Sequence, residues 1–270
     1  MRNILIHADD GPGMSARLES GLAIGRRHRS HLDLLISSPF QQFIATDPFG
    51  GMYLAGEQLA KAQAADAALD RRLRADLERE DVPWEVTLAD GDVLATLTLG
   101  ATLADLVIVS LGTADRRRSF TPPMMAGDLA MAVPAPVLAI PEPSGPIDLD
   151  APVMIAWNGS PQAAHALRAA VPLMRDAAQV IMVMVGEEEG LVAADDALRY
   201  LSRHERHAEL RHVERGVETI EEALERTARD IGAGLIVMGA FGHTRLRETF
   251  FGGVTRYLLE SAPAPLLLMH

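Results

Sequence analysis

The sequence predicts an α/β protein with two tandem doubly wound domains, each holding a five-stranded parallel sheet flanked by helices. Three observations lead to this fold. Short apolar runs alternate with helical patterns along most of the chain. The alternation stops at residues 141–152, which contain four prolines, and then starts again. Finally, two blocks recur at the same interval in both halves: ADLVIV at 104–109 returns as AGLIVM at 233–238, and APVLAI at 135–140 returns as APLLLM at 264–269.

The first half is predicted to alternate five strands with four helices. The strands are expected at residues 3–8, 32–38, 84–88, 106–110 and 137–140. The helices are expected at residues 14–29, 53–79 and 92–102, and in a segment that begins at Pro122 and Pro123. Leu69, Leu73 and Leu77 recur at four-residue spacing and mark the buried face of the longest helix. Proline is tolerated in a first helical turn, where the missing N–H has no partner in any case.

The second half repeats this alternation. Its strands are expected at residues 153–157, 180–185, 208–213, 235–238 and within 264–269. Its helices are expected at residues 160–174, 191–203, 217–231 and 256–261. We therefore expect one domain at residues 1–143 and a second at residues 150–270.

Composition excludes several classes of function. The chain has 270 residues and a net charge of −12, so its overall field repels nucleic acids and anionic membranes. It has no cysteine, which excludes disulfides, thiolate catalysis and cysteine-ligated zinc. No apolar run approaches the roughly 18 residues of a membrane helix, and the apolar stretch at the start is too short for a signal peptide. We expect a cytoplasmic protein that binds neither nucleic acid nor membrane.

A glycine-rich stretch, residues 239–255, follows a predicted strand and precedes the last helix. Its glycines are Gly239, Gly242, Gly252 and Gly253. Main-chain N–H groups without neighbouring side chains allow close approach of a phosphate, although a tight turn accounts for the same glycines equally well. His243, Arg245 and Arg247 add local positive charge to an acidic chain, as a phosphate site needs, while a solvated basic loop is the alternative.

The position of this stretch favours a ligand site. In doubly wound sheets, ligands bind beyond the carboxyl ends of the strands, where the strand order reverses. If the first and fourth strands of the second half are neighbours, the loop at 158–160 meets the loop at 239–247 there. The start of the last helix, near residues 252–255, would offer free N–H groups to an anion in the same cleft.

On these residues, the chain resembles the universal stress protein family over both halves. The family pattern is glycine, two residues, glycine, nine residues, glycine and then serine or threonine, and Gly239, Gly242 and Gly252 stand at those intervals. The resemblance implies the strand order 3-2-1-4-5 and ATP or a related adenine nucleotide as ligand, with Mg or Mn as a conceivable companion of the phosphates. It also implies pairing through the last strands, either in a homodimer or between the two domains of one chain.

Carried over by position, the resemblance implies a nucleotide site in the second half. Asn158 and Val185 would face the nucleoside, and Met238 and Gly239 would line it. The phosphates would be held by Gly242, Gly252, Gly253, Val254 and Thr255. The candidate set also includes Trp157, His243 and Arg245.

Two residues of this site depart from the family pattern. Gly253 stands where the family prefers serine or threonine, which removes a hydroxyl contact but keeps the backbone donor. Asn158 replaces the usual aspartate, and capping of the following helix is an alternative role for it.

The first half has lost the glycines. Gly239, Gly242, Gly252 and Gly253 correspond by position to Ser110, Thr113, Pro123 and Met124. The proline removes a backbone donor and the methionine adds bulk where a phosphate would lie. Asp9 matches the family's aspartate, but it has no cradle to work with. We therefore expect one working nucleotide site per chain, in the second half.

Other chemistries find no support in the sequence. There is no phosphate loop with a lysine, no dinucleotide fingerprint and no nucleophile elbow, so no catalytic residue is assigned and any ATP hydrolysis is expected to be slow. His204, His207 and His212 are expected to be structural or exposed. The leading hypothesis is a stress-response sensor or adaptor. An interaction module of the same fold without nucleotide is the alternative. Separately, we expect the aromatic residues of segment 40–53 either to cover the vacant cleft of the first half or to face a partner, with ordinary loop packing as the alternative.

Overall fold

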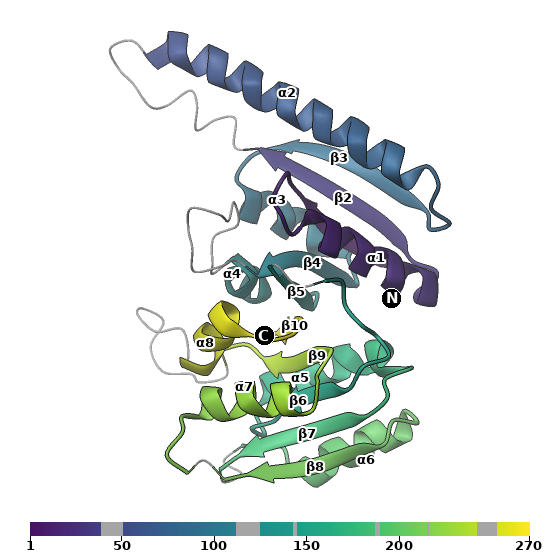
Figure 1. The fold of residues 1–270 in the computed structure, drawn as a ribbon, viewed down its shortest axis with the longest axis vertical. Coiled ribbons are helices and arrows are strands. Elements are labelled where there is room, and N and C mark those ends of the chain that lie inside the picture. Colours follow the sequence, from purple (N-terminus) through teal and green to yellow (C-terminus); the bar gives the residue numbers. More distant parts are fainter. Residues whose placement is uncertain (39–50, 112–124, 143–144, 187–189, 215, 242–252) are drawn as a thin grey trace.

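The computed structural model describes residues 1–38, 51–111, 125–142, 145–186, 190–214, 216–241 and 253–270, and the side chains of residues 51–55 are left aside. Ten strands form one sheet in the order β3-β2-β1-β4-β5-β10-β9-β6-β7-β8 (Figure 1). Each half therefore has the predicted order 3-2-1-4-5, and the two halves meet at β5 and β10. The predicted fold class is confirmed.

The first half supplies five strands and four helices. The strands are β1 (Asn3–Ala8), β2 (His31–Ser38), β3 (Trp84–Asp90), β4 (Leu106–Leu111) and β5 (Val137–Pro141). The helices are α1 (Met14–His28), α2 (Gly51–Leu77), α3 (Val93–Gly100) with the 3-10 turn η2 (Ala101–Leu103), and α4 (Met125–Ala132). The predicted helix start at Pro122 and Pro123 lies outside the described residues, as do Phe40, Phe43 and Phe49 of the aromatic segment.

The second half repeats this arrangement. Its strands are β6 (Val153–Ala156), β7 (Val180–Val185), β8 (Ala208–Val213), β9 (Leu235–Gly239) and β10 (Leu266–Met269). Its helices are α5 (Pro161–Ala170) with the 3-10 turn η3 (Val171–Met174), α6 (Ala194–Arg203), α7 (Ile220–Asp230) and α8 (Gly253–Ser261).

Three helix starts differ from the sequence prediction by three residues: α6, expected from residue 191, begins at Ala194, and the other two are those of α7 and α8. The helix expected from residue 217 starts at Ile220, because Thr219 caps it: Glu222 N donates to Thr219 Oγ1 and Thr219 N donates to Glu222 Oε2. The helix expected from residue 256 already begins at Gly253. The last of these shifts brings the free N–H groups of α8 next to the glycine-rich stretch.

Alternate residues along each strand enter two separate cores. In β1, Ile4 and Ile6 face the core covered by α1, α2, α5 and α6, while Leu5 faces the core covered by α3, α4, α7 and α8. Figure 1 shows helices on both faces along the length of the sheet. Both faces of the parallel strands are thus buried, which is why these strands read as continuous apolar runs.

The halves join through an antiparallel ladder and a helix contact. Leu266, Leu267 and Leu268 of β10 pair with β5, while every other neighbouring pair of strands in the sheet is parallel. Beside this ladder, α4 approaches α8 so closely that a Cβ on Gly127 would lie 2.9 Å from Leu259 Cδ1 and 3.1 Å from Phe241 Cζ. Within the described residues, no helix is both long and apolar enough to cross a membrane.

Candidate functional site

The strand order reverses between β6 and β9. From β6 the chain crosses through α5 to β7, and from β9 it crosses through α8 to β10 on the other side. Since α5 and α8 cover opposite faces of the sheet, the two connections diverge beyond the carboxyl ends of β6 and β9, which is the place where doubly wound sheets form a ligand crevice. The first and fourth strands of the second half are neighbours, which is the condition for the two predicted loops to meet, but residues 242–247 of the second loop lie outside the described residues.

The loop after β6 is held by local hydrogen bonds. Asn158 Oδ1 accepts from Ser160 N at 3.1 Å, and Ser160 Oγ accepts from Ala163 N at 3.1 Å. Ser160 is therefore the N-cap of α5, and the side chain of Asn158 closes a turn with the backbone N–H of Ser160. The Asn158 side chain is exposed, so its amide N–H₂ faces solvent at the mouth of the crevice while its oxygen is engaged.

Gly159 in the same loop adopts a φ of +69° and lies against the segment after β7. A Cβ on Gly159 would stand 2.7 Å from Gly190 Cα, and Val192 N donates to Gly159 O at 3.0 Å. Glycine is needed here because of both the left-handed backbone and the close approach.

Gly239, at the end of β9, is explained by packing. A Cβ on it would lie 2.5 Å from Ala163 N and 2.6 Å from Gln162 C, both backbone atoms of the first turn of α5. In the first half the glycine is on the other side of the same contact: Ser110, the last residue but one of β4, faces Gly13, the N-cap residue of α1. One member of each strand–helix pair is thus glycine, so Gly239 alone does not indicate a ligand.

The other described candidates divide between the two faces of the sheet. Val185 and Met238 belong to the core under α7 and α8, and Val254 packs against it. Trp157 is 4% exposed and lies in the opposite core, under α5 and α6, which separates it from Val185 and Met238. Thr255 is 5% exposed on α8, directly after Val254. Gly242, His243, Arg245 and Gly252 lie outside the described residues.

Gly253 is the first residue of α8 and is exposed. A Cβ on it would meet no described atom within 4 Å. The departure from serine or threonine at this position is therefore not required by packing.

Sequence reasoning missed Gln162. Its side-chain oxygen is buried and has no hydrogen-bond partner among the described residues, and its Cβ lies against Gly239. A buried acceptor without a partner is unfavourable by about 1–3 kcal/mol, so this oxygen could accept a hydrogen bond from a ligand. The only signal in the sequence is its position in the first turn of the helix after β6.

In the first half, the space between the corresponding strand ends is filled by Arg17, one helical turn after Gly13, the counterpart of Gln162. Its side chain is fully buried, with Nη2 donating to Asp9 Oδ1 at 2.5 Å and Nη1 donating to Ser110 Oγ. Asp9 follows β1 and Ser110 lies in β4, so this guanidinium bridges the two strand ends that correspond to β6 and β9. Its Nε has no partner in the described part of the chain.

Sheet register identifies the counterpart of Arg17. Ile4 pairs with Leu106, and Val153 pairs with Leu235, so β1 and β6 can be superposed residue by residue. Arg17 then corresponds to Ala166, which is fully buried. An arginine among the buried positions of α1, beside Met14, Gly21 and Ile24, is the sequence signal that was overlooked.

Burial and charge determine the ionisation of this cluster. Burial lowers the pKa of His7 from 6.5 to about 4. The carboxylate of Asp9, whose Oδ2 lies 3.6 Å from His7 Nδ1, raises this pKa but does not outweigh burial. Burial alone would raise the pKa of Asp9, but Arg17 and His7 hold it below its ordinary value. Burial raises the pKa of Glu142 nearby. The cluster is thus an ion pair between Arg17 and Asp9 beside a neutral imidazole.

Comparisons with known proteins agree with this architecture. Residues 151–270 match the model of the universal stress protein family. Three solved structures align over nearly the whole chain. A universal stress protein from Archaeoglobus fulgidus DSM 4304 has a TM-score of 0.74 at 14% identity and covers 99% of this chain and 97% of its own.

The other two structures come from Pseudomonas aeruginosa. A UCBPP-PA14 protein assigned to the same family has a TM-score of 0.64 at 18% identity and covers 100% of this chain and 93% of its own. PA1789 from strain PAO1, described as functionally unknown, has a TM-score of 0.63 at 16% identity and covers 100% of this chain and 92% of its own. At such identities the likeness shows the fold alone. None of the curated proteins compared with the chain matches it.

Residues 151–270 match the model of the universal stress protein family, and the whole chain has the tandem α/β fold of the full-length structures to which it is similar.

Proposed function

We propose that the second half binds an adenine nucleotide, ATP or a close relative, in the crevice beyond β6 and β9. One observation carries this proposal: Arg17 fills the strand-order reversal of the first half, whereas the buried Ala166 stands in its place in the second half. The half that keeps the glycine spacing is also the half in which the described residues place no buried arginine at this point.

The start of α8 supplies the phosphate end of the site. The helix begins at Gly253, and its free N–H groups carry partial positive charge next to the glycine-rich stretch. Gly242, Gly252, His243 and Arg245 would complete the cradle, with Mg or Mn as a companion of the phosphates. In this proposal, Asn158 and the orphaned Gln162 oxygen contact the nucleoside end.

The same proposal assigns a role to the whole chain, as a cytoplasmic stress-response sensor or adaptor and not as an efficient enzyme. Residues 1–143 and 150–270 act as two domains that pair through β5 and β10. Phe241 supports communication between them, because it directly precedes Gly242 and packs against Gly127 of α4. A change in the nucleotide loop would thus reach the first half.

Calorimetric titration with ATP tests the proposal, together with nucleotide analysis of the denatured, freshly purified protein. We expect one ATP per chain, lost on Gly242→Val or Gly252→Val and kept on the matched control Gly145→Val. Gly145 is exposed and, like Gly253, meets no described atom around its Cβ position. Binding of two equivalent ATP molecules contradicts the assignment to one half. No binding of ATP, ADP or AMP leaves the interaction module as the function.

A further inference from the structure

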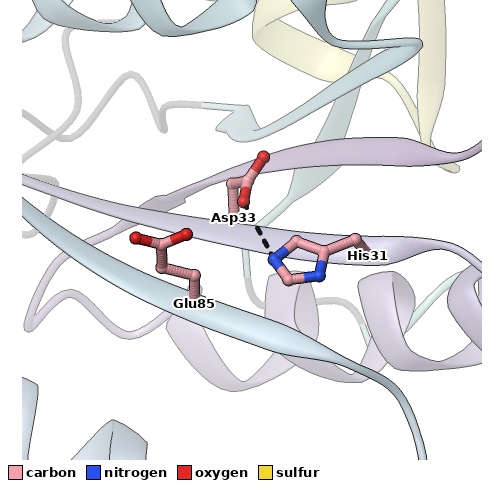
Figure 2. A group of neighbouring side chains, drawn as sticks. All are labelled: His31, Asp33 and Glu85. Atoms are coloured by element: carbon pink, nitrogen blue, oxygen red, sulfur yellow. Dashed lines mark ion pairs between the residues drawn. The ribbon is translucent and has the colours of Figure 1, made fainter.

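Three side chains with metal-binding groups gather on the outer strands of the first half, far along the sheet from the nucleotide crevice. They are His31 and Asp33 of β2 and Glu85 of β3. One ligand atom from each lies within 4.8 Å of the others, and His31 Nε2 is 3.3 Å from Asp33 Oδ1. Figure 2 shows the three side chains on the two neighbouring strands, with a dashed line for the ion pair between His31 and Asp33.

The strand register explains why these residues meet. His31 and Asp33 are two residues apart, so they project from the same face of β2. Asp33 stands directly opposite Glu85 in the parallel pair of β2 and β3. The face is the one that Leu35 shares with α3, but Asp33 remains 43% exposed and His31 39% exposed. An ion could therefore reach the three groups from solvent.

The second half provides an internal comparison at the same three positions. Ile4 pairs with Leu32 in the first half and Val153 pairs with Val180 in the second, so this register gives the residues of β7 that correspond to His31 and Asp33. The counterpart of Glu85 is the β8 residue that pairs with the counterpart of Asp33. The counterparts are Gln179, Ile181 and Glu209. In that half Gln179 Nε2 donates to Glu209 Oε2 at 3.0 Å, and Ile181 is 1% exposed under α7.

The first half thus carries a carboxylate where the fold elsewhere buries isoleucine. Aspartate is disfavoured within strands, and two carboxylates on adjacent strands repel each other. A divalent cation between them would remove that repulsion. The imidazole adds a nitrogen ligand, which favours transition metals over Mg²⁺ or Ca²⁺.

We propose that His31, Asp33 and Glu85 form a binding site for a divalent transition-metal ion. Ligand atoms about 2.0–2.2 Å from one ion lie about 3–4 Å apart, so small rotations of these exposed side chains bring all three into range. Three protein ligands leave at least one position for water or an external ligand, as in open zinc sites. The site lies in the half that the proposed nucleotide function does not use, so the two proposals stand separately.

Calorimetric titration of the nucleotide-free full-length chain with ZnCl₂ tests the proposal. We expect one saturable Zn²⁺ per chain. Removing a residue that only hydrogen-bonds to a metal ligand weakens metal affinity by about 10–100-fold, and removing a ligand itself should weaken it at least as much. We therefore expect Zn²⁺ affinity to fall at least about tenfold in each of the variants His31→Gln, Asp33→Asn and Glu85→Gln. The matched control Glu209→Gln, at the equivalent position of the second half, should leave Zn²⁺ affinity unchanged.

Two further measurements separate loss of the site from loss of the fold. Zn²⁺ should raise the melting temperature of the wild type and not of Asp33→Asn, whose own melting temperature should not fall, because it loses a like-charge contact. Co²⁺ should give visible absorption bands that change in His31→Gln. Zn²⁺ affinity that survives all three variants overturns the proposal. So does Mg²⁺ affinity equal to that for Zn²⁺, since it would show that the imidazole takes no part.

Discussion

Arg17 Nη2 donates to Asp9 Oδ1 at 2.5 Å, at the point of the first half that corresponds to the proposed nucleotide site of the second. The arginine side chain is 0% exposed and that of Asp9 18%. An internal cation here occupies the place that an anionic ligand would need. This buried ion pair is a second reason, beside the missing glycines, to expect no nucleotide in the first half.

Replacing Arg17 should destabilise the protein markedly. Arg17→Met leaves the carboxylate of Asp9 without its countercharge, and breaking a buried pair on one side costs about 3–5 kcal/mol. The double variant Arg17→Met/Asp9→Asn should recover much of this loss, because neither charge remains buried. Denaturant unfolding followed by circular dichroism measures both effects.

A surface arginine provides the control for this experiment. Arg26 is 46% exposed and pairs with Asp81 at 2.8 Å, so Arg26→Ala should cost at most about 1 kcal/mol. Equal losses for Arg17→Met and Arg26→Ala would show that the Arg17 pair is not a buried one in solution.

Stability should fall as the pH is lowered from about 6.5 to about 4 because of His7. Its pKa is 6.5 in the unfolded chain and about 4 in the folded protein, so within this window the unfolded state binds a proton that the folded state does not. The loss for this group approaches about 3 kcal/mol below pH 4. Asp9, whose pKa is also lowered, adds a loss in the same direction at lower pH.

The variant His7→Gln isolates this contribution. Whatever its stability at pH 8, we expect its free energy of unfolding to fall less steeply than that of the wild type between pH 6.5 and 4. Parallel pH curves for the two proteins would mean that His7 titrates normally in the folded state.

The strands and the duplication could be predicted because they depend on local signals, whereas the strand order is expected from the family resemblance. Apolar runs such as 106–110 and 235–238 carry their strand character within a few residues, and the repeat needs no knowledge of contacts. The Arg17 cluster and the His31 triad could not be predicted in this way. Each depends on which residues of different strands stand side by side, and register is set by packing of the whole sheet.

The glycine-rich stretch shows a further limit. Its spacing led to one interpretation, a phosphate site, for all its glycines. Gly239, however, packs against the backbone of α5, whereas a Cβ on Gly253 would meet no described atom within 4 Å. Spacing along the chain cannot separate a glycine needed for close packing from one that is free to bind. Only the distances around each Cβ position do so.

Gly239→Ala should therefore lower stability even without any ligand. The added methyl would lie 2.5 Å from Ala163 N and must push the first turn of α5 away from β9. Overpacking of this kind costs about 1–3 kcal/mol. Thermal unfolding of the nucleotide-free protein should show the loss, and Gly253→Ala should show none.

A compensating change sharpens this prediction. The first half tolerates Ser110 because Gly13 faces it. Gly239→Ser combined with Gln162→Gly copies that pair and should recover part of the stability lost in Gly239→Ser alone. If Gly239→Ala is as stable as the wild type, the contact between β9 and α5 is looser than the structure has it.

Gly253→Ser should strengthen ATP binding. Serine at the first position of α8 restores the hydroxyl of the family pattern, and a Cβ there meets no described atom within 4 Å. One added hydrogen bond to a charged phosphate contributes about 1.5 kcal/mol, or roughly a tenfold lower dissociation constant by calorimetry. Gly145→Ser, at an equally open glycine away from the crevice, should leave the affinity unchanged. If Gly253→Ser binds ATP no better than Gly145→Ser, the start of α8 does not reach the phosphates, and the cradle must be formed by the glycine loop alone.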